Sequence, residues 1–148
     1  MPPIPVRPGI YKIHAHIIGP SAVLTATEHA TKHGAPVIAD RLNPLPIEQE
    51  WIIEPTESVP GAPYVIRLAH HESAGIVASD DKLWVNSVPR GEFAKFTFER
   101  VIGGIKIISD KGLALRAGHR GAQLTLVPPK PEFQETWTLE FVSPISED

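Results

Sequence analysis

The chain has 148 residues, no cysteine and a formal net charge of −3. Its 16 prolines and 11 glycines favour turns over long helices, and an apolar fraction of 42% suffices for a packed core. This composition excludes a disordered chain, a disulfide-stapled miniprotein and any site that needs a cysteine thiol. Because no Lys/Arg-rich run occurs and the longest apolar run, residues 35–39, is too short to span a bilayer, the sequence predicts neither a nucleic acid nor a membrane as a partner.

The N-terminal residues Met-Pro-Pro-Ile-Pro have neither the cationic start nor the apolar stretch of a secretory signal, so we expect a cytoplasmic protein. The length suits one packed domain and leaves little room for a second. We therefore expect a single domain over residues 1–148.

Three units of similar pattern follow one another along the chain. Each opens with alternating apolar residues, at 9–13, 62–66 and 103–107, and each closes with an aromatic residue, a spacer, an apolar residue and glutamate. The closing aromatic residues are Trp51, Phe96 and Trp137. The first unit is longer than the other two, as expected for a duplicated unit with one loop insertion. The expected repeats are about 9–55, 62–100 and 103–142.

Two further β-prone runs lie inside each unit, each bounded by Gly, Pro, Asp or Asn. They occupy residues 23–27, 36–42, 74–78, 82–88, 113–117 and 122–127. Four short strands in each of three units predict an all-β chain, and the threefold pattern is typical of a β-trefoil, a six-stranded barrel capped by three hairpins. Residues 22–33 are rich in Ala and Thr and leave a short helix as the alternative there. The core is expected to hold the closing aromatic residues and Ile13, Ile66 and Ile107.

No residue pattern indicates catalysis, a cofactor or a metal. The carboxylate pairs Asp80/Asp81 and Glu132/Glu135 fall in polar turns, and neither a nucleophile elbow nor a phosphate-cradling glycine loop is present. The seven histidines are His14, His16, His29, His33, His70, His71 and His119. A spacing of two places the first pair on one face of a strand, but no zinc signature gathers three or four ligands. We expect no enzyme activity, no cofactor and no metal site.

Loops are the remaining candidates for function, because binding residues concentrate on connections held by a rigid scaffold. Four loops are braced by proline, at residues 41–46, 54–63, 87–91 and 128–131. The connection of the first hairpin, residues 28–34, carries a lysine.

Four segments resemble a known family: 9–13 (Gly-Ile-Tyr-Lys-Ile), 51–55 (Trp-Ile-Ile-Glu-Pro), 64–66 (Tyr-Val-Ile) and 137–140 (Trp-Thr-Leu-Glu). They are similar to the mushroom β-trefoil serine protease inhibitors of the cospin and cnispin group, and the similarity extends from residue 9 to residue 142. The resemblance implies a fungal β-trefoil that presents a substrate-like loop to a trypsin-like serine protease. The related mycocypins inhibit papain-like proteases and legumain, which adds cysteine proteases to the implied partners.

A trypsin-type pocket has an aspartate at its base and accepts a Lys or Arg side chain. In the resembling family the connection between the second and third strands inhibits, and here it includes Thr31, Lys32 and His33. The resemblance therefore implies that Lys32 enters the protease pocket, with Arg90 as the second choice. The other basic candidates are Arg41 and Arg120. The loop that would serve legumain, residues 70–73, lacks the asparagine that this protease requires.

The alternative from another class is a carbohydrate-binding lectin of the ricin-B type, with a glycan as partner. Such lectins often show Gln-x-Trp near the end of each unit, and Gln49-Glu50-Trp51 matches once. Residues 80–86 combine aspartate, tryptophan and asparagine, the residue types of a sugar site. Trp84 is therefore the tryptophan that this alternative assigns to binding.

Overall fold

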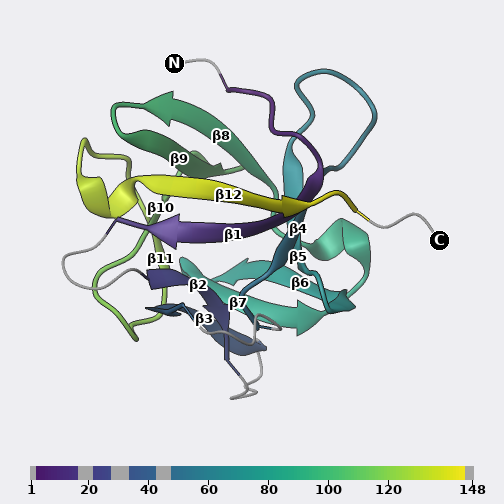
Figure 1. The fold of residues 1–148 in the computed structure, drawn as a ribbon, viewed down its shortest axis with the longest axis horizontal. Helices are drawn as coiled ribbons and strands as arrows, with labels where there is room; N and C mark the ends of the chain where they lie inside the picture. The colour runs from purple at the N-terminus through teal and green to yellow at the C-terminus, as the bar shows by residue number, and fades with distance from the viewer. Residues whose placement is uncertain (1–2, 17–21, 28–33, 43–47, 146–148) are drawn as a thin grey trace.

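The computed structural model of the chain describes residues 3–16, 22–27, 34–42 and 48–145 (Figure 1). Its strands are β1 (Gly9–Ala15), β2 (Ala22–Ala26), β3 (Ala35–Arg41), β4 (Trp51–Pro55), β5 (Tyr64–Leu68), β6 (His71–Ser79), β7 (Lys82–Ser87), β8 (Phe96–Val101), β9 (Gly104–Ser109), β10 (Ala114–Arg116), β11 (Thr125–Val127) and β12 (Trp137–Ser143). The described elements also include two short 3₁₀ turns, η2 (Arg90–Glu92) and η3 (Phe133–Glu135). The chain is all-β, as predicted, and within the described ranges no helix is long and apolar enough to cross a membrane.

Six strands close into a ring through antiparallel pairing. β1 pairs with β4 and β12, β5 pairs with β4 and β8, and β9 pairs with β8 and β12. β1 and β12 run side by side across the front of the molecule in Figure 1. Along β1 the side chains alternate, with Tyr11 and Ile13 buried and Lys12 and His14 partly exposed. This period of two is the one that the apolar pattern predicts.

The other six strands form the hairpins β2–β3, β6–β7 and β10–β11. In Figure 1 the first two lie in the lower part of the molecule and the third lies at the left. β7 pairs with both β3 and β11, and Ile38 of β3 bridges Gln123 of the third hairpin. The three hairpins therefore contact one another.

The core contains equivalent aromatic side chains at the start of β4, β8 and β12. The exposed fractions of Trp51, Phe96 and Trp137 are 0%, 1% and 0%. The indole N–H of Trp51 donates to the carbonyl of Leu24 in β2 over 2.9 Å, and that of Trp137 donates to Leu115 in β10 over 3.0 Å. The predicted burial of these residues is confirmed, and the matching acceptors relate the first unit to the third.

β11 is shorter than the predicted run at residues 122–127, because the chain before it bonds to a different hairpin. The N–H groups of Gly121 and Leu124 donate to the carbonyls of Ala39 and Val37 over 2.7 and 2.9 Å. These acceptors belong to β3 and not to β10. The connection between β10 and β11 is thus held against the first hairpin.

Candidate binding surfaces

The loop implied to be inhibitory, with Thr31, Lys32 and His33, lies outside the described residues, but both of its ends are described. Thr27 donates to the carbonyl of Pro36 from its backbone N–H over 3.2 Å and from its hydroxyl over 2.7 Å. Gly34 has a φ of +113°, and a Cβ there would lie 2.3 Å from the carbonyl oxygen of Val85 in β7. Only glycine fits this approach, so the loop begins and ends on fixed points of the scaffold.

Arg90, the second choice for the inhibitory residue, is the first residue of η2 and hydrogen-bonds to β4. Its guanidinium donates to the Glu54 carboxylate and, over 3.0 Å, to the carbonyl of Pro55. Glu54 also accepts from Nε of Arg67 over 2.8 Å. Burial opposes ionisation of Glu54, but the hydrogen bonds and charges of the two arginines outweigh it and lower the pKa of this carboxyl. The Arg90 guanidinium is therefore held in an ion pair.

The other basic candidates sit in different settings. Arg120 is exposed in a tight turn, in which the N–H of Ala122 donates to the carbonyl of His119 over 3.2 Å and Gly121 has a φ of +90°. Arg41 is exposed at the end of β3. A turn this tight does not provide the extended backbone that a protease pairs with, which ranks Arg120 below a longer loop.

The residues of the lectin alternative form the β6–β7 hairpin. Asp80 and Asp81 both have a φ of 55° and make its turn. Trp84 is 9% exposed, and its indole N–H donates to the carbonyl of Ser79 over 3.0 Å. The ring is therefore part of the packed interior, and this segment does not present the open aromatic platform that a sugar needs.

The histidines are distributed over several partners. His14 and His16 lie on one face, as their spacing predicts, and both contact β12, through Glu140 at 2.6 Å and Thr138 at 2.7 Å. His70 contacts Glu50 at 2.9 Å. Within the described ranges, no group of three or more His, Asp or Glu side chains is placed to hold a metal ion.

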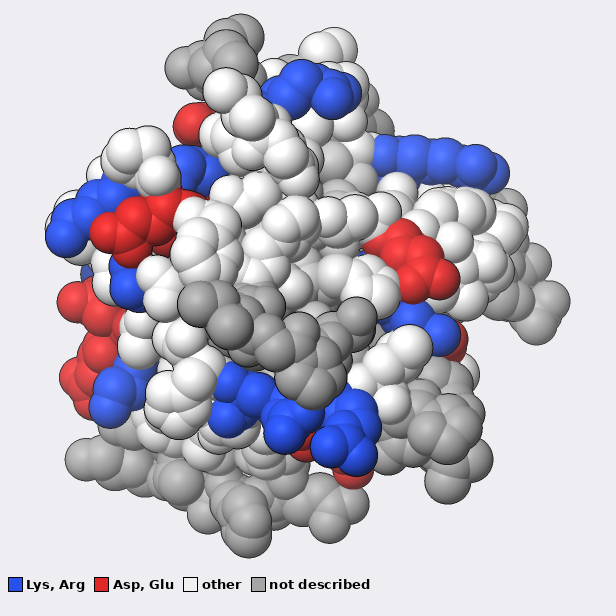
Figure 2. Space-filling view, turned by 60° about the vertical axis from the view of Figure 1, so that its left-hand side comes forward, with Lys and Arg blue, Asp and Glu red and all other residues white. Residues whose placement is uncertain are grey.

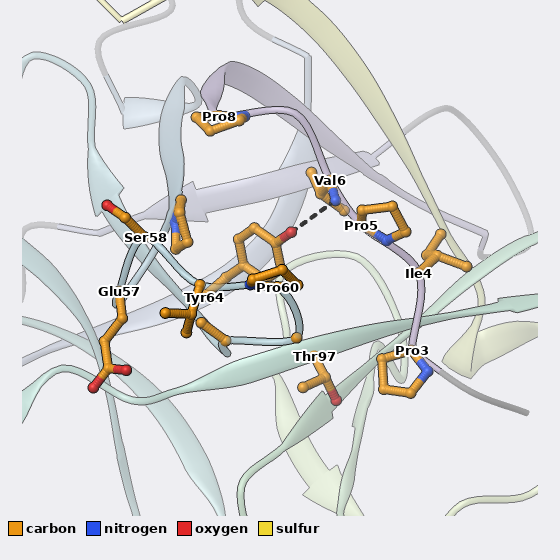
Figure 3. A pocket seen from close by; sticks show the side chains of 14 residues that line it. Pro3, Ile4, Pro5, Val6, Pro8, Glu57, Ser58, Pro60, Tyr64 and Thr97 are labelled. Atoms are coloured by element: carbon orange, nitrogen blue, oxygen red, sulfur yellow. Dashed lines mark hydrogen bonds between the residues drawn. The ribbon is translucent and has the colours of Figure 1, made fainter.

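A cleft of about 400 Å³ lies between the N-terminal segment and the β4–β5 loop (Figure 3). The Tyr64 ring stands between the two, and its hydroxyl accepts from the N–H of Val6 over 2.8 Å. Pro3, Pro5 and Pro60 lie around it. The N-terminal segment is fixed in place, because the N–H of Ile4 also donates to the carbonyl of Phe98 over 2.7 Å.

A larger pocket of about 630 Å³ lies between the β8–β9 turn and the segment that precedes β12. We call it the Phe133 pocket; its lining includes His16, Arg100, Ile102, Lys106, Glu132 and Phe133. Figure 2 turns forward the side of the molecule on which η3 lies in Figure 1. Uncharged side chains fill the upper middle of that face, and basic and acidic side chains lie on either side of them.

A buried ion pair stands behind the Phe133 pocket. Glu135 in η3 is 0% exposed, and its Oε1 accepts from Nζ of Lys106 over 2.9 Å and from the N–H of Lys130 over 2.8 Å. Nζ of Lys106 also donates to the carbonyl of Lys130 over 2.5 Å. Oε2 of Glu135 has no hydrogen-bond partner among the described residues and lies 3.7 Å from a guanidinium nitrogen of Arg116. The sequence analysis placed Glu135 in a polar turn, and its complete burial corrects that expectation. The pattern could not show the cluster, because its members lie on separate elements.

No protein-family model and no curated protein sequence matches this chain. Solved structures do match over nearly its whole length. The Rhizoctonia solani agglutinin has a TM-score of 0.73 at 11% identity and covers 95% of this chain and 99% of its own. A structure described as the BEL β-trefoil has a TM-score of 0.69 at 14% identity, covering 95% and 98%. A proteinase inhibitor from Coprinopsis cinerea has a TM-score of 0.67 at 13% identity, covering 93% and 100%.

The chain has the β-trefoil fold. Identities this low show the fold alone, and the same fold carries an agglutinin and a proteinase inhibitor. Function therefore has to be argued from the loops and pockets of this chain.

Proposed function

We propose that this protein inhibits a trypsin-like serine protease, and that the β2–β3 connection enters the active site with Lys32 in the specificity pocket. The observation that carries the proposal is the fixed stem of this connection, at Thr27 and Gly34. A loop whose ends are already held loses less conformational entropy when it binds. A trefoil can present such a loop without a disulfide, and this chain has no cysteine.

The fold permits the proposal, because a Coprinopsis cinerea proteinase inhibitor shares it over 93% of this chain. One further observation favours the β2–β3 connection over the lectin alternative. The lectin alternative needs an exposed aromatic ring, and the ring that it assigns to binding, that of Trp84, is buried in its own hairpin. Arg90 ranks below Lys32 because a protease would first have to separate its guanidinium from Glu54.

The test is an inhibition panel of trypsin, chymotrypsin, subtilisin, papain and legumain, with the parent and the Lys32→Glu variant. The variant places a carboxylate beside the aspartate of a trypsin-type pocket, and loss of an interface anchor costs about 2 kcal/mol or more. We expect the inhibition constant for trypsin to rise at least about thirtyfold, since each 1.4 kcal/mol corresponds to about tenfold. The matched control is Lys111→Glu, which reverses an exposed charge on the β9–β10 turn and should inhibit like the parent.

Arg90→Gln separates the two candidate loops. If it abolishes inhibition while Lys32→Glu does not, the η2 loop is the reactive one. If both variants inhibit like the parent, the substrate-like mechanism fails. A glycan array run with the same protein addresses the alternative: glycan binding without inhibition of any protease in the panel would replace the proposed function by that of a lectin.

A further inference from the structure

The Phe133 pocket gathers apolar side chains that the fold leaves in water. Ile102 at the tip of the β8–β9 turn is 102% exposed and Phe133 is 50% exposed, and both line this one pocket. Exposed apolar side chains that cluster mark binding sites more often than scattered ones. The pocket volume of about 630 Å³ lies within the range of small-ligand sites, about 300–1,000 Å³.

The pocket is held in shape before any ligand arrives. η3 is fixed to β10, because the guanidinium of Arg116 donates to the side-chain oxygen of Gln134 over 2.9 Å and the N–H of Ala117 donates to the Gln134 carbonyl over 3.0 Å. The buried pair of Glu135 and Lys106 fixes the other side of the same turn. Phe133 therefore projects from a rigid support and needs little ordering on binding.

The charge that remains for a ligand is positive. Lys106 is paired with Glu135, and Glu132 is paired with Arg116. Arg100 is exposed, and no ion pair or hydrogen bond holds its guanidinium within the part of the chain that the structure describes. A free guanidinium at the edge of a pocket suits a carboxylate, which it can bind with two parallel hydrogen bonds.

One oxygen of the pocket is left to accept a hydroxyl. Oε2 of Glu132 accepts from Arg116, while Oε1 accepts no hydrogen bond from the described residues, and the side chain is 40% exposed. Because Arg116 neutralises this carboxylate, it does not repel an acidic ligand strongly. The pocket thus offers an aromatic face, a hydroxyl acceptor and a carboxylate receptor.

We propose that the Phe133 pocket binds an acidic sugar, a pyranose that carries a carboxylate. The apolar face of the ring packs on Phe133, the carboxylate pairs with Arg100, and a ring hydroxyl donates to Glu132. A neutral sugar leaves Arg100 without its partner, and a hydrocarbon acid leaves Glu132 without its donor. This site is separate from the β2–β3 connection and does not depend on protease inhibition.

The experiment titrates the ¹⁵N-labelled protein with glucuronic acid and N-acetylneuraminic acid and follows amide resonances by NMR. We expect at least one of the two acids to shift the amides of Lys106 and Thr136, with a dissociation constant of about 1 mM or tighter. Methyl glucoside is the neutral probe, and cyclohexanecarboxylate is the acid without hydroxyls. Both should bind at least about tenfold more weakly.

Arg100→Gln and Phe133→Ala should each weaken the acidic sugar at least about tenfold. Their matched controls are Arg120→Gln and Phe141→Ala, exposed residues outside the pocket, which should bind like the parent. Both pocket variants should inhibit proteases as the parent does, which separates this site from the proposed function. The proposal is overturned if neither acid shifts the pocket amides, if cyclohexanecarboxylate binds as tightly, or if a short peptide with a free carboxylate binds where the sugars do not.

Discussion

Removal of the Glu135 carboxylate should destabilise the fold strongly, because it leaves the buried Lys106 ammonium group without its counter-ion. In Glu135→Ala, the side chain of Lys106, which is 12% exposed, keeps the Lys130 carbonyl as its one hydrogen-bond partner among the described residues. Two hydrogen bonds to a charged group are lost, each worth about 1.5–3 kcal/mol. Loss of one partner of a buried ion pair costs about 3–5 kcal/mol. The hydrogen-bond figure and the ion-pair figure both give a loss of about 3 kcal/mol or more in unfolding free energy.

Urea unfolding followed by tryptophan fluorescence measures this loss. With a denaturant slope of about 2 kcal/mol per molar, a loss of about 3 kcal/mol lowers the midpoint by about 1.5 M. The matched control is Glu132→Ala in the same segment. Its carboxylate is 40% exposed, so its pair with Arg116 contributes about 1 kcal/mol at most.

The double variant Lys106→Met/Glu135→Leu tests the cause. Replacement of a buried ion pair by apolar side chains of similar size is often close to neutral, so most of the lost stability should return. The reasoning is refuted if Glu135→Ala costs no more than Glu132→Ala. It is also refuted if the double variant is as unstable as the single one, since the loss then comes from the Lys130 hydrogen bond and not from the stranded charge.

Three further predictions concern the scaffold. Trp137→Ala should lower the unfolding free energy in urea by about 3–5 kcal/mol, because it opens a cavity and leaves the Leu115 carbonyl without its donor. Gly34→Ala should lower the unfolding free energy by more than about 1 kcal/mol, since its φ of +113° and the close Val85 carbonyl leave no room for a Cβ. Gly61→Ala is the control and should lower it less, because a Cβ at this position, with a φ of +83°, would have nothing within 4 Å. Glu54→Gln should destabilise the protein at neutral pH. Because folding lowers the pKa of the Glu54 carboxyl, its contribution to the unfolding free energy is present above the ordinary pKa of 4.5 and is lost as the pH falls through the folded pKa. The unfolding free energies of parent and variant should therefore converge in acid. Equal differences at all pH values would contradict the last prediction.

The sequence predicted what depends on local pattern. Alternation of apolar residues predicted the strands, because a barrel strand buries every second side chain. The equivalent burial of Trp51 and Trp137 followed directly.

The side-chain pairings could not be predicted, because they join residues that are distant in the chain. Glu54 forms an ion pair with Arg90, 36 positions away in the sequence, and Lys106 forms one with Glu135, 29 positions away. Neither spacing belongs to a local motif. Phe133 belongs to a polar, proline-rich segment whose sequence predicts an ordinary loop. The pocket around Phe133 forms because the β8–β9 turn folds against that segment, which the local sequence does not indicate.

The pairing of β1 with β12 also determines when this protein can finish folding. The contact between His14 and Glu140 spans 126 positions, so the ring closes only after the last strand is available. Contacts at such separations demand a large loop-closure entropy and slow the folding of β-rich domains. During synthesis on the ribosome, the β1 edge that faces β12 stays open until residues 137–143 have emerged. An open edge is a template for pairing with other chains, so the nascent chain is most prone to aggregate in this interval, and the closed ring removes that risk.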